Sequence, residues 1–234
     1  MKNQYFGDVN DYCKYGLLRC LAGKGVLRVM MAWMLTEDDD SRDGRNLAYL
    51  TKPQQWRISD PDLFDTLSIL HSTQIARSVL YAEERDFIPG AVYHSRLLTD
   101  NHSERTEFFN ELSLQASTAD LIFFDPDNGI EVKSVPYGRK NSSKYVYWHE
   151  LQSAFTRGHS LLVYQHFPRQ HRTAYLNSLH DRIREHLQPA GVTFFWSSHV
   201  AFVLISQKRH QRHFKRTTSD ICTNWNNTFQ VFSR

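Results

Sequence analysis

Apolar residues recur along the chain at two spacings, one typical of amphipathic helices and one typical of buried strands. Helical spacing is clearest after Asp60 and Pro61, which suit the first positions of a helix, and it continues through Leu63 and Leu67. The same pattern predicts further helices over residues 10–22, 103–116, 145–155 and 172–187. We expect Ser103 to be the N-cap of the 103–116 helix.

Short aliphatic and aromatic runs predict strands at residues 27–35, 91–98, 121–124, 160–167, 192–198 and 201–207. The runs at 121–124 and 160–167 lack polar alternation, as strands covered on both faces do. The predicted 145–155 helix lies between them. The last two runs are too close for a parallel crossover and should form an antiparallel hairpin. The pattern predicts an α/β, Rossmann-like fold whose mostly parallel central sheet ends in an antiparallel hairpin, a layout similar to that of class I methyltransferases.

Length and composition narrow the class of protein. At 234 residues, 41% of them hydrophobic, the chain can bury a large core, so we expect one α/β domain over 1–234 with a basic C-terminal segment at 208–234. No run approaches the roughly 20 apolar residues of a membrane span, and the first residues lack the apolar core of a signal peptide. We therefore expect a cytoplasmic protein without a membrane partner. The three cysteines form no CxxC pair, which argues against a cysteine zinc site.

Charge is distributed unevenly, although the net charge is only +3. The segment "KRHQRHFKR" (208–216) holds five Lys or Arg residues, and "TEDDDSRD" (36–43) is acidic. Both runs are compatible with a solvated surface. The basic run also suits contact with the phosphates of a nucleic acid, which we therefore expect as a partner. None of these features specifies the oligomeric state.

The stretch "LIFFDPDNGIEVKS" (121–134) carries the strongest candidate for chemistry. Asp125 directly follows a predicted buried strand, Pro126 ends the strand, and Asn128 with Gly129 permits a sharp turn. Ligands of open α/β sheets bind outside the carboxyl ends of the strands, so Asp125 and Asp127 are candidate catalytic residues there. An ordinary strand-ending turn is the alternative.

The next predicted strand ends in "YQHFPR" (164–169). If it lies beside the 121–124 strand, His166 and Arg169 come close to Asp125 and, together with Asn128, form a candidate substrate-binding group. Arg169 suits a phosphate in particular. A buried His166 that is satisfied by backbone groups is the alternative.

Two of these segments resemble a known family. "YFGDVNDYCKYGLLRCL" resembles the N-terminal segment of the RlmJ-type ribosomal RNA adenine-N6 methyltransferases at Gly7, Asp11 and Lys14, and "FFDPDN" resembles their Asp-Pro-Pro-Tyr motif at Asp125 and Pro126. The resemblance implies that Asp125 accepts a hydrogen bond from the amino group of adenine. It also implies that Lys14 and Asp11 lie near the cofactor S-adenosylmethionine.

The chain departs from the family pattern at two places. Asp127 and Asn128 stand where the family has Pro-Tyr, and the glycine-rich turn that follows the family's first strand is replaced by a segment with a single glycine, Gly44. That turn normally lets the backbone approach the cofactor closely.

Two other functions are compatible with the same residues. "DPDNGIEVKS" resembles the PD…ExK signature of metal-dependent nucleases, with Asp125 or Asp127 and Glu131 holding Mg²⁺ and Lys133 assisting the attacking water. Alternatively, the chain is a non-catalytic nucleic-acid-binding module on a methyltransferase-like fold.

Overall fold

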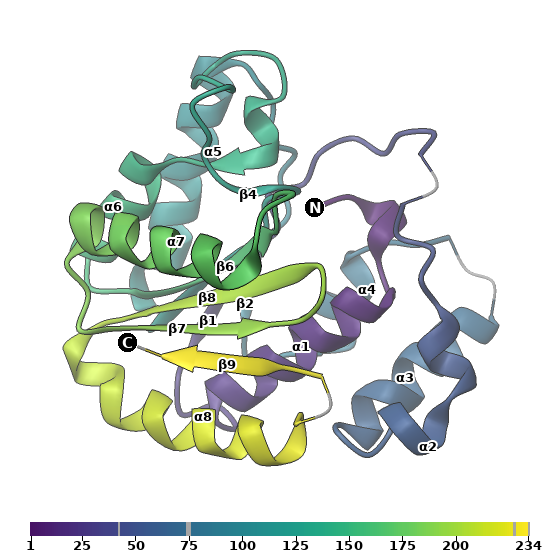
Figure 1. Ribbon diagram of the computed structural model, residues 1–234. Coiled ribbons are helices and arrows are strands. Elements are labelled where there is room, and N and C mark those ends of the chain that lie inside the picture. Colours follow the sequence, from purple (N-terminus) through teal and green to yellow (C-terminus); the bar gives the residue numbers. More distant parts are fainter. Residues whose placement is uncertain (42, 74–75, 227, 234) are drawn as a thin grey trace.

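A mixed β-sheet runs through the centre of the protein (Figure 1). The computed structural model describes residues 1–41, 43–73, 76–226 and 228–233. Within these ranges the sheet has seven strands: β1 (Val29–Ala32), β2 (Val92–His94), β3 (Leu121–Phe124), β6 (Ser160–His166), β7 (Gly191–Trp196), β8 (Val200–Ser206) and β9 (Gln230–Ser233). Their order across the sheet is β2-β1-β3-β6-β8-β7-β9. The first four in this order are mutually parallel, whereas β8, β7 and β9 are joined by antiparallel pairing.

The α/β class expected from the sequence is therefore confirmed, with a sheet whose core is parallel and compatible with a Rossmann-like fold. The predicted hairpin is present as β7 and β8, with Phe194 opposite Val203. A further strand, β9, pairs with the outer side of β7 and has no counterpart among the predicted elements. The sheet thus ends in three antiparallel strands beyond β6.

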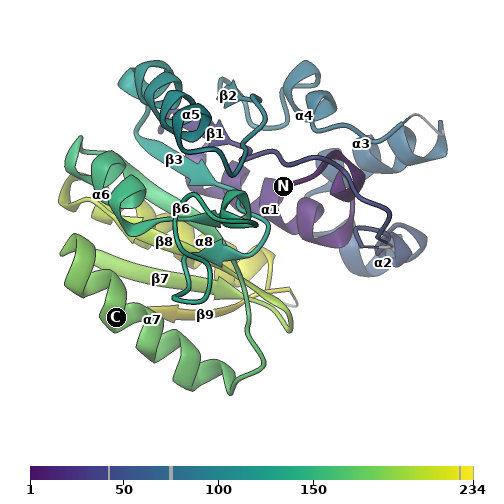
Figure 2. The same ribbon diagram turned by 90° about the horizontal axis from the view of Figure 1, so that it is seen from above.

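Helices cover both faces of the sheet. They are α1 (Val9–Ala22), α2 (Pro53–Trp56), α3 (Pro61–Ser72), α4 (Leu80–Glu84), α5 (His102–Gln115), α6 (Trp148–Thr156), α7 (Arg172–Leu187) and α8 (Gln211–Asn224). Successive strand residues point to opposite faces. Met31 and Phe123 pack in one core with α1, α3 and α8, while Met30 and Phe124 pack in a second core with α5, α6 and α7. Seen from above, the molecule spreads from α3 and α4 on one side to α7 on the other (Figure 2).

The ends of the predicted elements follow capping chemistry. Asp60 accepts a hydrogen bond from the backbone N–H of Leu63 at 3.1 Å, which confirms it as the N-cap of α3. The predicted strand at 121–124 coincides with β3. The prediction for Ser103 is wrong, because the N-cap of α5 is Asn101, whose side-chain oxygen accepts from the N–H of Ser103 at 2.9 Å.

The basic run at 208–216 is not an extended tail. It forms a short 3₁₀ turn (Lys208–His210) and the first turns of α8, whose buried residues Phe214, Thr217 and Ile221 recur at helical spacing. The C-cap of this helix, Trp225, lies so close to Gly16 of α1 that a Cβ at position 16 would meet the indole ring at 2.0 Å. Residues 227 and 234 of the predicted basic segment lie outside the described residues. Of the helices in the described ranges, none has the length and apolar character needed to cross a membrane.

A buried ion pair joins α5 and α6 to a small two-stranded sheet of β4 (Gly129–Ile130) and β5 (Tyr145–Val146). The fully buried Arg105 side chain donates from Nε and Nη2 to the Glu150 carboxylate at 2.6 and 2.8 Å. It also donates to the carbonyl oxygens of Ser142 and Tyr145 at 3.0 and 2.7 Å. The Tyr147 ring lies 4.9 Å from the guanidinium carbon. Every nitrogen of this cation therefore has a partner.

Candidate functional site

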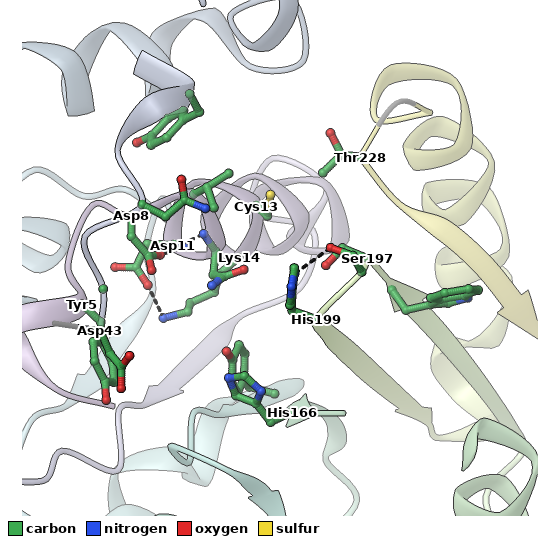
Figure 3. A pocket seen from close by; sticks show the side chains of 18 of the residues that line it. Tyr5, Asp8, Asp11, Cys13, Lys14, Asp43, His166, Ser197, His199 and Thr228 are labelled. Carbon is green, nitrogen blue, oxygen red and sulfur yellow. Dashed lines mark hydrogen bonds and ion pairs between the residues drawn. The ribbon is translucent and has the colours of Figure 1, made fainter. Parts of the chain in front are cut away.

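A pocket of about 1060 Å³ opens at the carboxyl ends of β3 and β6, where the sequence predicts a site (Figure 3). Its walls come from α1, the 43–56 segment, the turn after β3, the end of β6, the turn between β7 and β8, and the segment that follows α8. The charged, polar and aromatic residues that line it include Asp8, Asp11, Lys14, Tyr49, Lys52, Trp56, Asp125, Asp127, Asn128, Lys144, Tyr164, His166, Trp196, His199 and Phe229.

The floor of the pocket is a buried network around Lys14. Lys14 Nζ lies 2.6 Å from Asp11 Oδ1 and 2.6 Å from Asp125 Oδ2, and all three side chains are at most 3% exposed. The other oxygen of Asp11 accepts from the Gly7 N–H at 3.0 Å and from the Tyr15 hydroxyl at 3.2 Å. Within the described residues, the Asp125 side chain accepts at Oδ2 and has no protein donor at Oδ1. Asp125 therefore keeps one acceptor free in the pocket wall.

Burial and neighbouring charges set the protonation of this network. Burial alone would lower the pKa of Lys14, but the attraction of Asp11 and Asp125 outweighs it and raises that pKa, so the amine stays charged. Burial raises the pKa of Asp125, and the Lys14 ammonium partly opposes this rise. Asp8 accepts from the N–H groups of Asn10 and Asp11 as the N-cap of α1, and burial together with the Asp11 charge raises its pKa to about 7.

The turn after β3 is fixed from two sides. Gln165 accepts from the Ile130 N–H at 2.9 Å and donates to the Asn128 carbonyl at 3.2 Å. Gly129, with φ of +119°, leaves room for this side chain, since a Cβ there would lie 2.5 Å from Gln165.

On the opposite side of the turn, Asp127 is held by the start of the chain and by the segment after β1. It lies 2.7 Å from the Met1 amino nitrogen and accepts from the Thr36 hydroxyl at 3.0 Å. The Met1 amino group also donates to the backbone carbonyl of Asp125 at 2.9 Å. Both acidic residues of the turn are therefore fixed in place.

The rim of the pocket carries charges of both signs and aromatic rings. Lys52, Lys144, His166 and His199 line it, as do the exposed Asp39 and Asp43 and the rings of Trp56 and Trp196. The rings of Tyr49 and Tyr164 also line the pocket but are buried. Figure 3 shows Asp11 and Lys14 on one side of the pocket and His166 and His199 on the other. The pocket thus combines a free carboxylate oxygen with aromatic rings and with two lysines, Lys52 and Lys144, in its lining.

His166 ends β6 and is exposed, so the alternative of a buried histidine satisfied by backbone groups is wrong. Its backbone N–H donates to the Asn128 carbonyl at 3.1 Å. The surrounding protein removes part of the water around its ring, and this desolvation, with the nearby His199, lowers the pKa of His166. The neutral imidazole is therefore favoured at pH 7.

The structure brings together only part of the predicted site. Asp11, Lys14, Asp125, Asp127, Asn128 and His166 all line the pocket. Glu131, Lys133 and Arg169 are not among its lining residues. Glu131 Oε2 instead accepts from the Trp148 N–H at 3.0 Å at the start of α6, and Lys133 and Arg169 are exposed. The carboxylate expected to complete a Mg²⁺ site thus satisfies a helix terminus.

Ligand sets of the kind expected for metals are also absent from the described ranges. No group of three or more His, Cys, Asp or Glu side chains within residues 1–41, 43–73, 76–226 and 228–233 is arranged to hold a metal ion. Asp11 and Asp125, the two buried carboxylates of the floor, are bridged by the Lys14 ammonium instead.

The segment after β1 is where the resemblance implies that S-adenosylmethionine binds, so its side chains test whether the cofactor fits there. Trp33 and Met34 are fully buried and Leu35 is 5% exposed, so large side chains fill the strand end where the resemblance implies a glycine-rich turn. The Trp33 indole donates to Glu83 at 3.1 Å, and Met34 takes a φ of +46°, a conformation that glycine adopts more easily. None of the three residues is among those that line the pocket. These side chains do not fit the cofactor in the position that the resemblance implies.

The basic run lies away from the pocket. Arg209, at its start, donates to the carbonyl of Gly158, shortly before β6, and lies 4.0 Å from Asp120, directly before β3. The starts of β3 and β6 are at the opposite end of these strands from Asp125 and His166. The 3₁₀ turn at the start of the basic run therefore lies at the end of the sheet opposite the acidic floor. Lys52 and Lys144 supply positive charge near the pocket instead.

Sequence reasoning missed several residues of the pocket. Asp8 carries the signature of an N-cap, an acidic residue before a helix, and that signal is present in the sequence. Lys52, Lys144, Trp196 and His199 come from segments without a motif, and only the folded chain brings them to one place.

Comparisons with known proteins do not assign a family. No protein-family model matches the chain, and no curated protein matches it. Among solved structures, the chain is similar to protein LPL1258 from Legionella pneumophila str. Philadelphia 1, described under the family model DUF519, with 12% sequence identity and a TM-score of 0.45. The similarity covers 98% of this chain and 96% of that chain. At this TM-score the similarity supports no functional assignment, which has to rest on the sheet and the pocket themselves.

Proposed function

We propose that the protein recognises an amine-bearing base of a nucleic acid in the acidic pocket, on a sheet of class I methyltransferase type. The observation that carries the proposal is Asp125, which follows β3 with Oδ2 held by Lys14 and Oδ1 free of donors among the described residues. A carboxylate oxygen in that state accepts a hydrogen bond from an exocyclic amino group and rejects a carbonyl oxygen at the same place. The preorganised acceptor supports selection of adenine or cytosine over thymine.

The rest of the pocket supports a nucleotide over a small amine. Tyr164 and Trp196 supply aromatic surface on which a base can stack, which is a main attraction for unpaired bases. Lys52 and Lys144 at the rim suit the phosphates that flank the base. A base reaches such a pocket only from a single strand or after leaving the helix. We therefore propose single-stranded nucleic acid as the ligand.

Methyl transfer to the bound amine is the second candidate, and the position of Asp125 directly after β3 favours it over hydrolysis. Because the residues after β1 do not fit S-adenosylmethionine in the implied position, a methyl donor would have to bind elsewhere in the pocket. In either case the role of Asp125 is to accept from the amine, and the role of Lys14 is to keep Asp125 ionised and oriented.

The test compares binding of single-stranded octamers of deoxyadenylate, deoxycytidylate and deoxythymidylate, measured by fluorescence anisotropy. We expect the first two to bind at least about tenfold more tightly than the third, since a hydrogen bond to a charged group is worth about 1.5–3 kcal/mol. Asp125→Asn should remove the preference, because an amide can donate as well as accept. Asp220→Asn, which changes an exposed aspartate of α8, is the matched control and should retain it.

Equal binding of all three octamers by the unchanged protein would overturn the proposal. Transfer of a labelled methyl group from S-adenosylmethionine to the deoxyadenylate octamer, lost in Asp125→Asn, would establish the second candidate. Cleavage that requires Mg²⁺ and is lost in Glu131→Gln would favour the nuclease assignment, whereas cleavage that survives this substitution would place the metal elsewhere than the sequence suggests.

A further inference from the structure

A second cavity, of about 520 Å³, lies between α5 and α6 on the face of the sheet that carries Ile122 and Phe124. These two side chains of β3 line its base, Phe109 of α5 lines one wall, and Ala154 of α6 lines the other. The volume falls within the range of about 300–1,000 Å³ that is typical of small-molecule sites. The cavity is thus large enough for a small ligand, and its base is apolar.

Aromatic rings at the cavity give it a preferred ligand shape. The His102 and Tyr137 rings meet edge to face, with centroids 5.1 Å apart and planes at 84°. Tyr137 and His149 do the same at 4.9 Å and 71°. This row of rings lines the same cavity as Phe109 and Phe124. Flat ring systems pack well against such surfaces, by offset stacking or edge-to-face contact.

The charges of the lining favour an anion. Arg157, exposed at the end of α6, lines the cavity, and within the described residues its guanidinium has no hydrogen bond or ion pair. Glu150 is the carboxylate of the described lining, and Arg105 holds both of its oxygens. The charge left without a partner is therefore positive, and an Arg guanidinium with free N–H groups is a good partner for a carboxylate.

We propose that this cavity binds a small planar aromatic anion, with the rings of the ligand on Phe109, Ile122 and Phe124 and its acidic group at Arg157. The site is separate from the acidic pocket, which is lined by other residues, and the inference goes beyond the function proposed above. A nucleotide fits less well, because Arg157 is the single Lys or Arg of the described lining and a phosphate with two negative charges would keep one of them unpaired.

The experiment is isothermal titration calorimetry of the protein with 2-naphthoate. We expect saturable one-to-one binding that weakens at least about tenfold with the neutral analogue 2-naphthol, which corresponds to about 1.4 kcal/mol. Arg157→Glu should weaken the binding of 2-naphthoate by at least the same factor. Arg184→Glu, which changes an exposed arginine near the end of α7, is the matched control and should bind like the unchanged protein.

A second variant and a competitor locate the ligand. Ala154→Phe should fill the cavity and abolish binding, and the amide chemical shifts of Ile122 and Phe124 should respond to 2-naphthoate in the unchanged protein but not in this variant. Absence of binding, or equal binding by Arg157→Glu and the Arg184→Glu control, would overturn the proposal. Displacement of 2-naphthoate by AMP at comparable concentration would also overturn it, because the cavity would then be a nucleotide site.

Discussion

Two buried cations, Arg105 and Lys14, are satisfied in different ways. Arg105 is bound by both oxygens of Glu150 and by two backbone carbonyls, and it lies away from the acidic pocket. Lys14 is shared between Asp11 and Asp125, and one oxygen of Asp125 has no donor among the described residues. The first cation is saturated and joins three elements. The second belongs to a network that leaves capacity for a ligand.

The contrast shows where function is to be sought among buried charges. Bringing an ion pair out of water costs several kcal/mol per ion, and only excellent geometry with further hydrogen bonds repays that cost. The Arg105 pair meets this condition with protein groups alone. The Asp125 carboxylate does not, because burial raises its pKa despite the neighbouring ammonium. A buried charge that its own protein leaves incompletely satisfied is a candidate for ligand binding.

The strongest loss of stability should come from breaking the saturated pair. Arg105→Met should lower the free energy of unfolding by about 3–5 kcal/mol, because Glu150 is then buried without a counterion. Urea denaturation followed by circular dichroism measures this. Adding Glu150→Gln to the variant should recover part of the loss. A loss below about 1 kcal/mol would show that water replaces the guanidinium and that the pair is not structural.

A smaller loss is expected for the cation of the pocket. Lys14→Met should lower the free energy of unfolding by about 2–3 kcal/mol at pH 8. The loss is smaller than for Arg105 because Asp11 keeps its donors Gly7 and Tyr15, and Asp125 can take up a proton in place of the ammonium. Without Lys14 the folded-state pKa of Asp125 rises further, so the folded variant takes up a proton as the pH falls. The deficit should therefore be smaller at pH 5 than at pH 8 in urea denaturation. A deficit that does not depend on pH would contradict this account.

Replacing Asp8, which borders the same network, should raise the free energy of unfolding at high pH instead of lowering it. Its folded-state pKa of about 7 lies above the ordinary value of 3.8, so its contribution to stability is fully present below about pH 4 and is lost as the pH rises through 7. Asp8→Asn keeps the helix cap and removes the titration. We expect this variant to be more stable than the unchanged protein by at least about 1 kcal/mol at pH 8 and equally stable near pH 4. Urea midpoints across that range provide the check, and a variant that is less stable at pH 8 would refute the expectation.

The weakest effect is expected for an exposed pair with good geometry. Arg57 donates to both oxygens of Asp65 at 2.7 and 2.8 Å, in a pattern like that of Arg105 and Glu150. Water surrounds both side chains, so Arg57→Met should leave the thermal midpoint unchanged within error. Asp65→Asn should behave in the same way. A clear drop in either variant would mean that burial is not what separates the two arginine pairs.

The fold can be predicted from the sequence wherever the pattern is local. Asp60 and Pro61 begin α3 as capping chemistry dictates, and the apolar run at 121–124 is β3. The helix α8 is hidden because basic residues dominate its first turns, although Phe214 and Ile221 lie on one buried face. A charge run conceals an amphipathic helix when only a narrow face is buried.

The site can be predicted only in part, for a related reason. Asp125 follows a strand that hydrophobicity alone locates, so its place in the pocket is predictable. Glu131 also looks like a catalytic carboxylate in the sequence, but it satisfies the N–H of Trp148, a pairing that depends on where α6 starts in space. The bulk of Trp33 at the end of β1 likewise acquires meaning only through the space that it fills.

The contact between Gly16 and Trp225 would couple the binding of a ligand in the acidic pocket to the folding of the chain. It holds the segment around Phe229 against α1, so the acidic pocket is built from parts that are about 200 residues apart in the chain. The entropy cost of closing so long a loop has to be met before this contact can stabilise the pocket. Partly folded chains should therefore have no affinity for the ligand. A ligand of this pocket would then slow global unfolding and protect the whole chain from proteolysis together, because it can be held only by the complete native state.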